Sequence, residues 1–379
     1  MTTYLLHADS VFSPELRHEI GEAIGDPLIF IDHDDRRIVA GPTLERSTFE
    51  RREDVVDEFW TYEDLGRQAL VRDPAVPSHH ISPELVVRAL QKLAVYKVSV
   101  PPSFPALSAD YIRDKGIDVV IEPEAWAQRR RIKTPWELEG IERAQRATDM
   151  ALLTAARMLR DSEPTNGGGL RFEGEILTAD LLRIAMSAEL LTQGAESEEI
   201  LVQSGDACLR GHDLGTGPIL PDQSCIIDCF PRERKSGVYS DTTRTFVPGT
   251  PSDELKQLHQ HCVAAMEIAL EAIKPGRNDA YDKVAEYLHD KGFPTQKHTE
   301  GPPPTTGFFH ALGHGVGLQV HERPLIGLRA DNFIEGDVVA IEPGLYFPGI
   351  GGVRLEDTVM VTSSGAEHFT DPYPYDLEP

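Results

Sequence analysis

The sequence has little cysteine, a deficit of basic residues and no long apolar run. Its 379 residues include 4 cysteines, too few for a disulfide framework in a chain this long, and this favours a reducing cytoplasm. Lysine and arginine number 37 against 62 acidic residues, and the net charge of −25 disfavours nucleic acid and anionic membranes as partners. No segment approaches the roughly 18 apolar residues of a membrane span, and the N-terminus lacks the basic start of an export signal. We therefore expect a cytoplasmic protein that binds neither nucleic acid nor membrane.

The chain is longer than a usual single domain, so we expect two domains, each able to bury its own core. Residues 1–122 read as alternating short strands and helices, with residues 27–33 and 36–41 as a strand pair. Residues 123–133 are charged, and we expect an irregular linker there. Residues 134–379 hold the acidic and histidine clusters that could carry chemistry.

Two similar helix starts divide the second domain into halves. Thr134, Pro135 and Glu137 combine an N-cap, a proline at the first helical position and the acid of a capping box. A second start of this type stands at residues 250–253, and 250 − 134 = 116 residues separate the two. This spacing suggests an internal repeat.

Four acidic residues on candidate strands repeat with nearly the same offset: Asp228, Asp241, Glu342 and Glu356. Their separations are 342 − 228 = 114 and 356 − 241 = 115 residues. The segments PDQSCIID and EGDVVAIE support this alignment, because each is a turn followed by an apolar strand that ends in an acid. The second domain is therefore predicted to contain two copies of one unit, each a pair of helices followed by a strand hairpin, with a metal site between them.

Three histidines lie close together in the segment FFHALGHGVGLQVHE: His310, His314 and His321. Alone, they suggest a three-histidine metal cluster or a proton-transfer site. A buried carboxylate such as Glu342 needs a cation or hydrogen bonds to offset its desolvation. With four acids available to bind metal, one imidazole is enough to complete the ligand set. Four carboxylates and one imidazole can hold two divalent ions, and this ligand set favours Mn²⁺, Co²⁺ or Zn²⁺.

A thiolate metal site is the alternative use of the two cysteines beside the first acid. Cys225 and Cys229 flank Asp228, but no second Cys or His pair completes such a site. We favour buried apolar thiols in a strand.

Hydrolysis is the natural chemistry of two ions that share carboxylates. The ions would also share a water and lower its pKa, so that hydroxide is available near neutral pH. An attacked carbonyl develops an oxyanion and the leaving amine needs a proton, and histidine or arginine side chains can assist both. The candidates for these roles are His310, His321, His212 and Arg354.

The motifs resemble the pita-bread metallopeptidase family, which includes methionine aminopeptidase, aminopeptidase P, prolidase and creatinase. GHGVGLQVHE matches the histidine-ligand motif of that family, and EPG and VRLED match the segments that carry its two glutamates. The resemblance implies that the metal ligands are Asp228, Asp241, His314, Glu342 and Glu356.

The resemblance also implies roles beyond metal binding. Glu342 would act as the proton shuttle for the bridging water. His310 and His321 would lie on the substrate side, and His212 would be the histidine of the preceding loop. Arg354 would match the arginine of the proline-specific members.

An N-terminal α/β domain ahead of the catalytic domain is typical of prolidase, aminopeptidase P and creatinase. The fold class implied is α/β (α+β), with a creatinase-like N-terminal domain followed by a pseudo-two-fold pita-bread domain. The activity implied is that of a dinuclear peptidase, with Mn²⁺ as the first choice of ion, that hydrolyses the Xaa-Pro bond by attack of a metal-bridging hydroxide. Its substrate would be a peptide with proline at the second position, cleaved as by a prolidase-like dipeptidase or an aminopeptidase P. The resemblance further implies a homodimer, in which the N-terminal domain mediates dimerisation and borders the active site.

The first hairpin departs from the family pattern, because its two aspartates are 241 − 228 = 13 residues apart, a longer spacing than usual. An even extension keeps both acids on one face, since strand side chains alternate with period two. We expect the ligands to survive and the tip at residues 231–237 to affect specificity.

Two alternative functions stay open. The same fold could host a hydrolase or lyase for a small non-peptide substrate, although creatinase itself is disfavoured because it lacks the metal ligands that are present here. A metal-free binding protein is the alternative from another class, and the full set of ligand types argues against it.

Overall fold

The structure is a computed structural model that describes residues 2–52 and 54–379. It divides into two compact units, Met1–Arg130 and Arg131–Pro379. The helices in this described part of the chain are all too short or too polar to cross a membrane.

The first unit is built on one mixed sheet with the strand order β4-β3-β2-β1-β5-β6. Strands β1, β2 and β3 pair antiparallel, and the remaining neighbours pair parallel. The predicted strand pair is confirmed as β2 and β3, where Asp34 and Asp35 form the turn with positive φ. The strands are β1 (Tyr4–Ala8), β2 (Leu28–His33), β3 (Arg36–Gly41), β4 (Glu58–Thr61), β5 (Lys97–Val100) and β6 (Asp118–Ile121). The helices are α1 (Pro14–Ile20), η1 (Thr43–Glu45), α2 (Arg46–Phe49), α3 (Arg67–Arg72), α4 (Ser78–Lys92) and α5 (Ala106–Asp114).

The segment 123–133 is not the irregular linker that its charge suggested, because Pro123–Arg131 forms helix α6. Its arginines are held by acids rather than solvated. Arg129 pairs with Glu19 at 2.5 Å and Asp32 at 2.8 Å, and Arg131 pairs with buried Asp337 at 2.5 Å. These partners are distant in sequence, so local composition could not reveal that the segment is ordered.

The second unit begins with helix α7 (Pro135–Arg160), and its predicted start is confirmed. Thr134 caps the helix, and Glu137 completes the capping box by accepting from the backbone N–H of Thr134 at 2.7 Å. Helix α8 (Ala179–Thr192) packs beside α7, and the sheet β11-β12-β14 follows. The other elements of this half are β7 (Glu163–Pro164), β8 (Leu170–Phe172), β9 (Glu175–Ile176), β10 (Ala195–Glu196), β11 (Ile200–Ser204), η2 (Gly205–Leu209), β12 (Cys225–Cys229), β13 (Arg232–Glu233) and β14 (Thr242–Phe246).

The second half repeats this plan with helices α9 (Asp253–Ala272) and α10 (Ala280–Asp290) and the sheet β16-β15-β17-β20-β21. Its helix starts later than predicted, because Ser252 rather than Thr250 is the N-cap. Ser252 accepts from the backbone N–H of Leu255 at 3.1 Å. The other elements are η3 (Gln296–His298), β15 (Gly313–Gly315), β16 (Glu322–Ile326), β17 (Val338–Ile341), β18 (Gly344–Phe347), β19 (Gly351–Arg354), β20 (Asp357–Thr362) and β21 (Gly365–His368).

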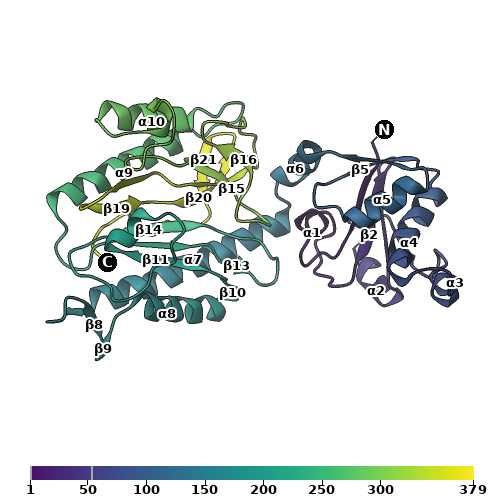
Figure 1. Cartoon of the computed structure of the whole chain (residues 1–379), viewed down its shortest axis with the longest axis horizontal. Helices are drawn as coiled ribbons and strands as arrows, with labels where there is room; N and C mark the ends of the chain where they lie inside the picture. The colour runs from purple at the N-terminus through teal and green to yellow at the C-terminus, as the bar shows by residue number, and fades with distance from the viewer. Residues whose placement is uncertain (1, 53) are drawn as a thin grey trace. The chain divides into compact units, whose positions relative to one another are not determined.

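The two halves place matching strands in matching order, since β11-β12-β14 in the first corresponds to β15-β17-β20 in the second. All of these neighbours pair antiparallel. Figure 1 shows helices α9 and α10 on one side of the strands and α7 and α8 on the other side. This arrangement agrees with the predicted pita-bread class, in which two helix-backed sheets enclose a site.

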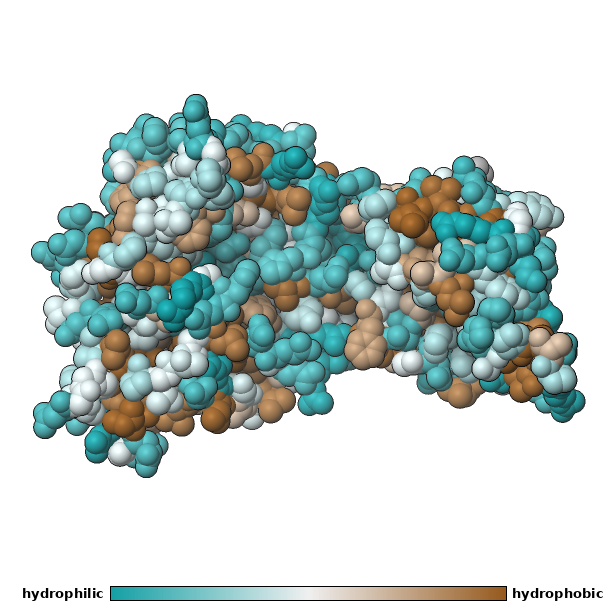
Figure 2. Space-filling model, viewed as in Figure 1, coloured by the Kyte–Doolittle hydropathy of each residue, from teal (hydrophilic) through white to brown (hydrophobic). Residues whose placement is uncertain are grey.

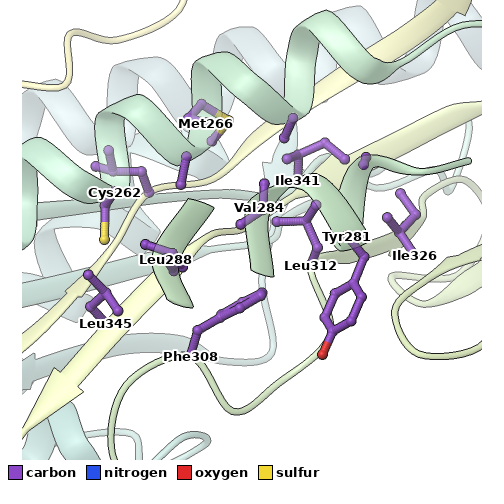
Figure 3. Packing of buried hydrophobic residues seen from close by; sticks show 14 of the residues in the cluster. Cys262, Met266, Tyr281, Val284, Leu288, Phe308, Leu312, Ile326, Ile341 and Leu345 are labelled. Carbon is purple, nitrogen blue, oxygen red and sulfur yellow. The ribbon is translucent and has the colours of Figure 1, made fainter. Parts of the chain in front are cut away.

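Apolar side chains fill the space between each helix pair and its sheet. In the second half, Cys262 and Met266 of α9 and Leu288 of α10 pack with Phe308 and Ile341 (Figure 3). In the first half, Cys225 and Cys229 are free thiols, fully buried in the core under α7 and α8. The prediction of buried apolar thiols is confirmed. On the surface, hydrophilic residues cover most of the face that Figure 2 shows.

The long first hairpin folds back onto α7. Its tip strand β13 pairs with β10, and Glu233 accepts hydrogen bonds from Ser236 and from Arg143 of α7. Gly140 of α7 provides the space for this contact, because a Cβ there would lie 2.3 Å from the Ser236 hydroxyl and 2.8 Å from a Val238 methyl.

We predict that Gly140→Ala destabilises the protein although alanine is the better helix former. Overpacking costs about 1–3 kcal/mol, against a propensity gain of about 1 kcal/mol. Thermal denaturation should show a Tm lower by about 2–4 °C. Gly167→Ala is the control, since its Cβ would meet nothing closer than 3.7 Å. An unchanged or higher Tm for Gly140→Ala would contradict this packing of the hairpin.

Candidate metal and catalytic site

Strand register in the first half places its two acids on one face. Asp228 lies within β12, directly opposite Thr243 of β14, and opposite residues in a pair of strands point to the same face. Asp241 precedes Thr243 by two residues, so it shares that face, although it stands just before β14 rather than within it. The predicted parity of the long hairpin is confirmed.

Strand register in the second half also places its two glutamates on one face. Ile341 of β17 pairs with Asp357 of β20, so the next residues outward, Glu342 and Glu356, fall opposite each other at the strand ends. Strand β15 pairs with the other edge of β17 and places His314 on the same face. Three of the four predicted acids thus stand at strand ends and not within strands.

The two faces bring these residues into one buried cluster. Asp241, His314 and Glu356 each offer one ligand atom, and these atoms all lie within 4.8 Å of one another. Nε2 of His314 lies 3.7 Å from Oδ2 of Asp241 and 4.0 Å from Oε1 of Glu342. Such a group is close enough to share one cation.

Two threonines hold the acids across the halves. Thr243 donates to Oε2 of Glu356 at 2.7 Å, while Thr358 donates to the backbone carbonyl of Asp241 at 2.8 Å and accepts from its N–H at 2.9 Å. Each threonine follows the acid of its own half by two residues, since 243 − 241 = 2 and 358 − 356 = 2. Sequence analysis missed both residues, but the recurring pattern acid-x-Thr was the signal that could have found them.

Burial and mutual repulsion make the ionised acids costly. Burial raises the pKa of Asp241 and of Glu356 well above the usual range, and the neighbouring carboxylates raise both further. Burial also raises the pKa of Glu342 to about 7, with Asp228 adding to the rise and Arg354 opposing it. Within the described residues, Oδ1 of Asp228 and Oδ1 of Asp241 are buried without a hydrogen-bond partner. These residues fit a divalent cation, which would satisfy the orphaned oxygens and offset the repulsion.

His314 is ready to act as a ligand. Burial, together with the nearby His321, lowers its pKa to about 4, so the imidazole is neutral at pH 7. Its Nδ1 lies 3.1 Å from the carbonyl oxygen of Gly315, which assigns the proton to Nδ1 and leaves the lone pair on Nε2.

Arg354 and His310 meet at a tyrosine hydroxyl that sequence analysis missed. Arg354 is buried in β19, where it donates to Oδ2 of Asp228 at 2.7 Å and to the hydroxyl of Tyr346 at 3.3 Å. Nε2 of His310 lies 3.1 Å from the same hydroxyl, and Nδ1 lies 4.0 Å from Oε2 of Glu342. Tyr346 stands four residues after Glu342, which is the same side of an extended chain, and this parity was its only signal in the sequence.

The two remaining histidines lie at the exposed side of the cluster. The ring of His321 is 4.3 Å from that of His314 between centroids, and its side chain is exposed. His212 is exposed in the loop after η2 and lies close enough to lower the pKa of both His310 and His321. The predicted site residues therefore gather at one place.

Comparisons with known proteins agree with this geometry. The model of metallopeptidase family M24 matches residues 139–363. The Xaa-Pro dipeptidase of Pyrococcus furiosus is 33% identical over 68% of this chain and 66% of its own length. The match therefore spans just under two thirds of that relative. The solved prolidase from Pyrococcus furiosus has a TM-score of 0.74 at 21% identity, covering 99% of this chain and 97% of the other. An Xaa-Pro dipeptidase from Bacillus anthracis has a TM-score of 0.77 at 22% identity, covering 99% and 94%. These solved structures establish the likeness in fold.

We predict that Glu342→Gln stabilises the metal-free protein at pH 8 but not below pH 4.5. A carboxyl whose pKa is raised to about 7 destabilises the folded state fully above that pH, and this penalty disappears as pH falls toward the unfolded value. The gain should be about 1–3 kcal/mol, measured as a higher Tm of chelator-treated protein. Glu335→Gln is the control, because Glu335 is exposed outside any helix or strand, and it should change the Tm little at either pH. If Glu342→Gln is less stable than wild type at pH 8, the ionised Glu342 carboxylate does not destabilise the folded state.

Proposed function

The chain belongs to metallopeptidase family M24, and from this membership we propose that it is a metal-dependent peptidase that hydrolyses the Xaa-Pro bond. The observation that carries the proposal is the buried group of Asp241, Glu356 and neutral His314, with the partly buried carboxylates of Asp228 and Glu342 beside it. The relatives named as Xaa-Pro dipeptidase and prolidase support proline at the second position of the substrate. Their names favour a dipeptidase over an enzyme for longer peptides.

Two divalent ions are the proposed cofactor, with Mn²⁺ as the first choice and Co²⁺ or Zn²⁺ as alternatives. The residues that would hold them are Asp228, Asp241, His314, Glu342 and Glu356. A bound divalent ion supplies Lewis acidity, which lowers the pKa of water and polarises a carbonyl. The orphaned oxygens of Asp228 and Asp241 support this assignment.

The roles of the protein's own side chains follow from their exposure and position. Glu342 has a side chain that is 22% exposed and lies 4.0 Å from His310, so it is the acid best placed to pass a proton toward the substrate side. His310, His321 and His212 surround that side and can donate to a developing oxyanion or to the leaving proline nitrogen. Arg354 keeps a permanent positive charge beside Asp228 and orients Tyr346.

A cytoplasmic homodimer is the proposed biological form. All four cysteines are free and buried, which suits a reducing compartment. The N-terminal unit, which we propose to be a separate domain for dimerisation, has its own sheet and core.

We predict that chelation abolishes activity and that adding Mn²⁺, Co²⁺ or Zn²⁺ restores it. The assay measures release of the first residue from Xaa-Pro dipeptides and from tripeptides with proline second. Dipeptides should be cleaved faster. Failure to cleave either set with any metal would overturn the peptidase proposal and favour a small-molecule substrate.

Asp241→Ala is the matched test of the site itself. This variant should lose activity and bound metal, because an acid at the centre of the cluster cannot be removed without disturbing every ion held there. Retention of the full metal content, measured by elemental analysis, would contradict the assignment of Asp241 as a ligand.

His321→Ala should separate catalysis from metal binding. The side chain is exposed beside His314 and outside the acid cluster, so metal content should stay near the wild-type value. We expect kcat to fall roughly 100-fold if His321 assists the transition state. Exposed His79→Ala is a control far from these groups in sequence. An unchanged kcat for His321→Ala would remove His321 from the mechanism.

A further inference from the structure

A buried glutamine supports the loop that carries His212. Gln203 lies in β11 and is fully buried. Its Nε2 donates to the carbonyl oxygens of Gly211 at 2.8 Å and of Asp213 at 2.7 Å, the two residues that flank His212. Both N–H bonds of the amide are therefore directed at the backbone on either side of one histidine.

The loop has other contacts, and two of them lie within the turn itself. The backbone N–H of Asp213 donates to the carbonyl oxygen of Arg210 at 2.7 Å, and the Arg210 guanidinium donates to Oδ2 of Asp213 at 2.5 Å. Arg183 donates to the carbonyl oxygens of Leu214 and Gly215 at 2.6 and 3.0 Å. Gly215 presses against β11, because a Cβ there would lie 1.8 Å from the carbonyl oxygen of Val202. The Arg210–Asp213 contacts close the turn on itself, and Arg183 and Gly215 fix the end of the loop, whereas the Gln203 side chain ties the turn that presents His212 to strand β11.

Burial of a glutamine side chain at this position costs free energy. Burying an amide costs free energy unless its groups are bonded, and Oε1 of Gln203 has no partner among the described residues. An apolar side chain of the same size would fill the core at less cost. The amide is therefore explained by the loop it holds rather than by packing.

We propose that Gln203 is a positioning residue that fixes His212 on the substrate side of the cluster. This inference rests on the proposed function, in which His212 contacts the substrate. Gln203 itself touches only backbone, so it acts through the histidine.

A double-mutant cycle tests the proposal, because a residue that acts through His212 has no effect once His212 is removed. Gln203→Met keeps the volume and removes both donors. We expect it to lower kcat/KM for an Xaa-Pro dipeptide about tenfold in the wild-type background and less than twofold in the His212→Ala background. Equal losses in both backgrounds would overturn the proposal, because they would mean a general structural role.

Hydrogen–deuterium exchange of residues 210–213 supplies a readout that needs no activity. Exchange should be faster in Gln203→Met than in wild type, and Gln203→Leu gives the same test if the methionine variant folds poorly. Arg183→Met is the matched control, since it loosens residues 214 and 215 and should leave kcat/KM within twofold. Unchanged exchange at 210–213 overturns the positioning role even if wild type cleaves Xaa-Pro peptides. If the wild-type protein does not cleave Xaa-Pro peptides, the proposed function is wrong. Faster exchange in Gln203→Met would still support the contact between Gln203 and the loop in that case.

Discussion

Repulsion among buried carboxylates is the constraint on which the rest of this structure depends. Asp241 and Glu356 come from different halves of the chain, yet both are almost fully buried and face each other's charge. Arg354 offsets only part of that cost, because its charge lowers the pKa of both acids while its hydrogen bond goes to Asp228. The cluster therefore fits a divalent ion, and the chain belongs to a family of metallopeptidases.

The repeated unit explains how two halves can hold one site with precision. Thr243 and Thr358 occupy equivalent places after their acids, and each bonds the acid of the other half. Neither half can move relative to the other without breaking a hydrogen bond to an acid of the cluster. A duplicated unit supplies this reciprocal arrangement at once, because one acid-x-Thr pattern serves as both the charged group and its support.

Features with a local signature were predictable, and features that depend on distant partners were not. The capping box of Thr134 and the even spacing of Asp228 and Asp241 follow from short-range rules, and the structure confirms both. Helix α6 escaped prediction because its arginines find their acids far away in sequence. Tyr346 and Gln203 escaped for the same reason, since a tyrosine or glutamine in a strand has no pattern that reveals which backbone or side chain it will meet. The start of α9 was misplaced because Thr250 and Ser252 are both good N-cap residues, and the local sequence does not distinguish them.

The two carboxylate oxygens of Asp228, a proposed metal ligand, have different surroundings. Its Oδ2 accepts from Arg354 at 2.7 Å, while its Oδ1 is buried without a partner among the described residues. The two oxygens therefore face different neighbours, and an ion at Oδ1 need not displace the guanidinium from Oδ2. Arg354 in turn bonds Tyr346, whose hydroxyl lies 3.1 Å from Nε2 of His310, so a hydrogen-bonded chain runs from the acid to His310. A charge at Asp228 therefore polarises this chain of hydrogen bonds as far as His310, and the proposed metal ligand and the proposed substrate-side histidine belong to one network.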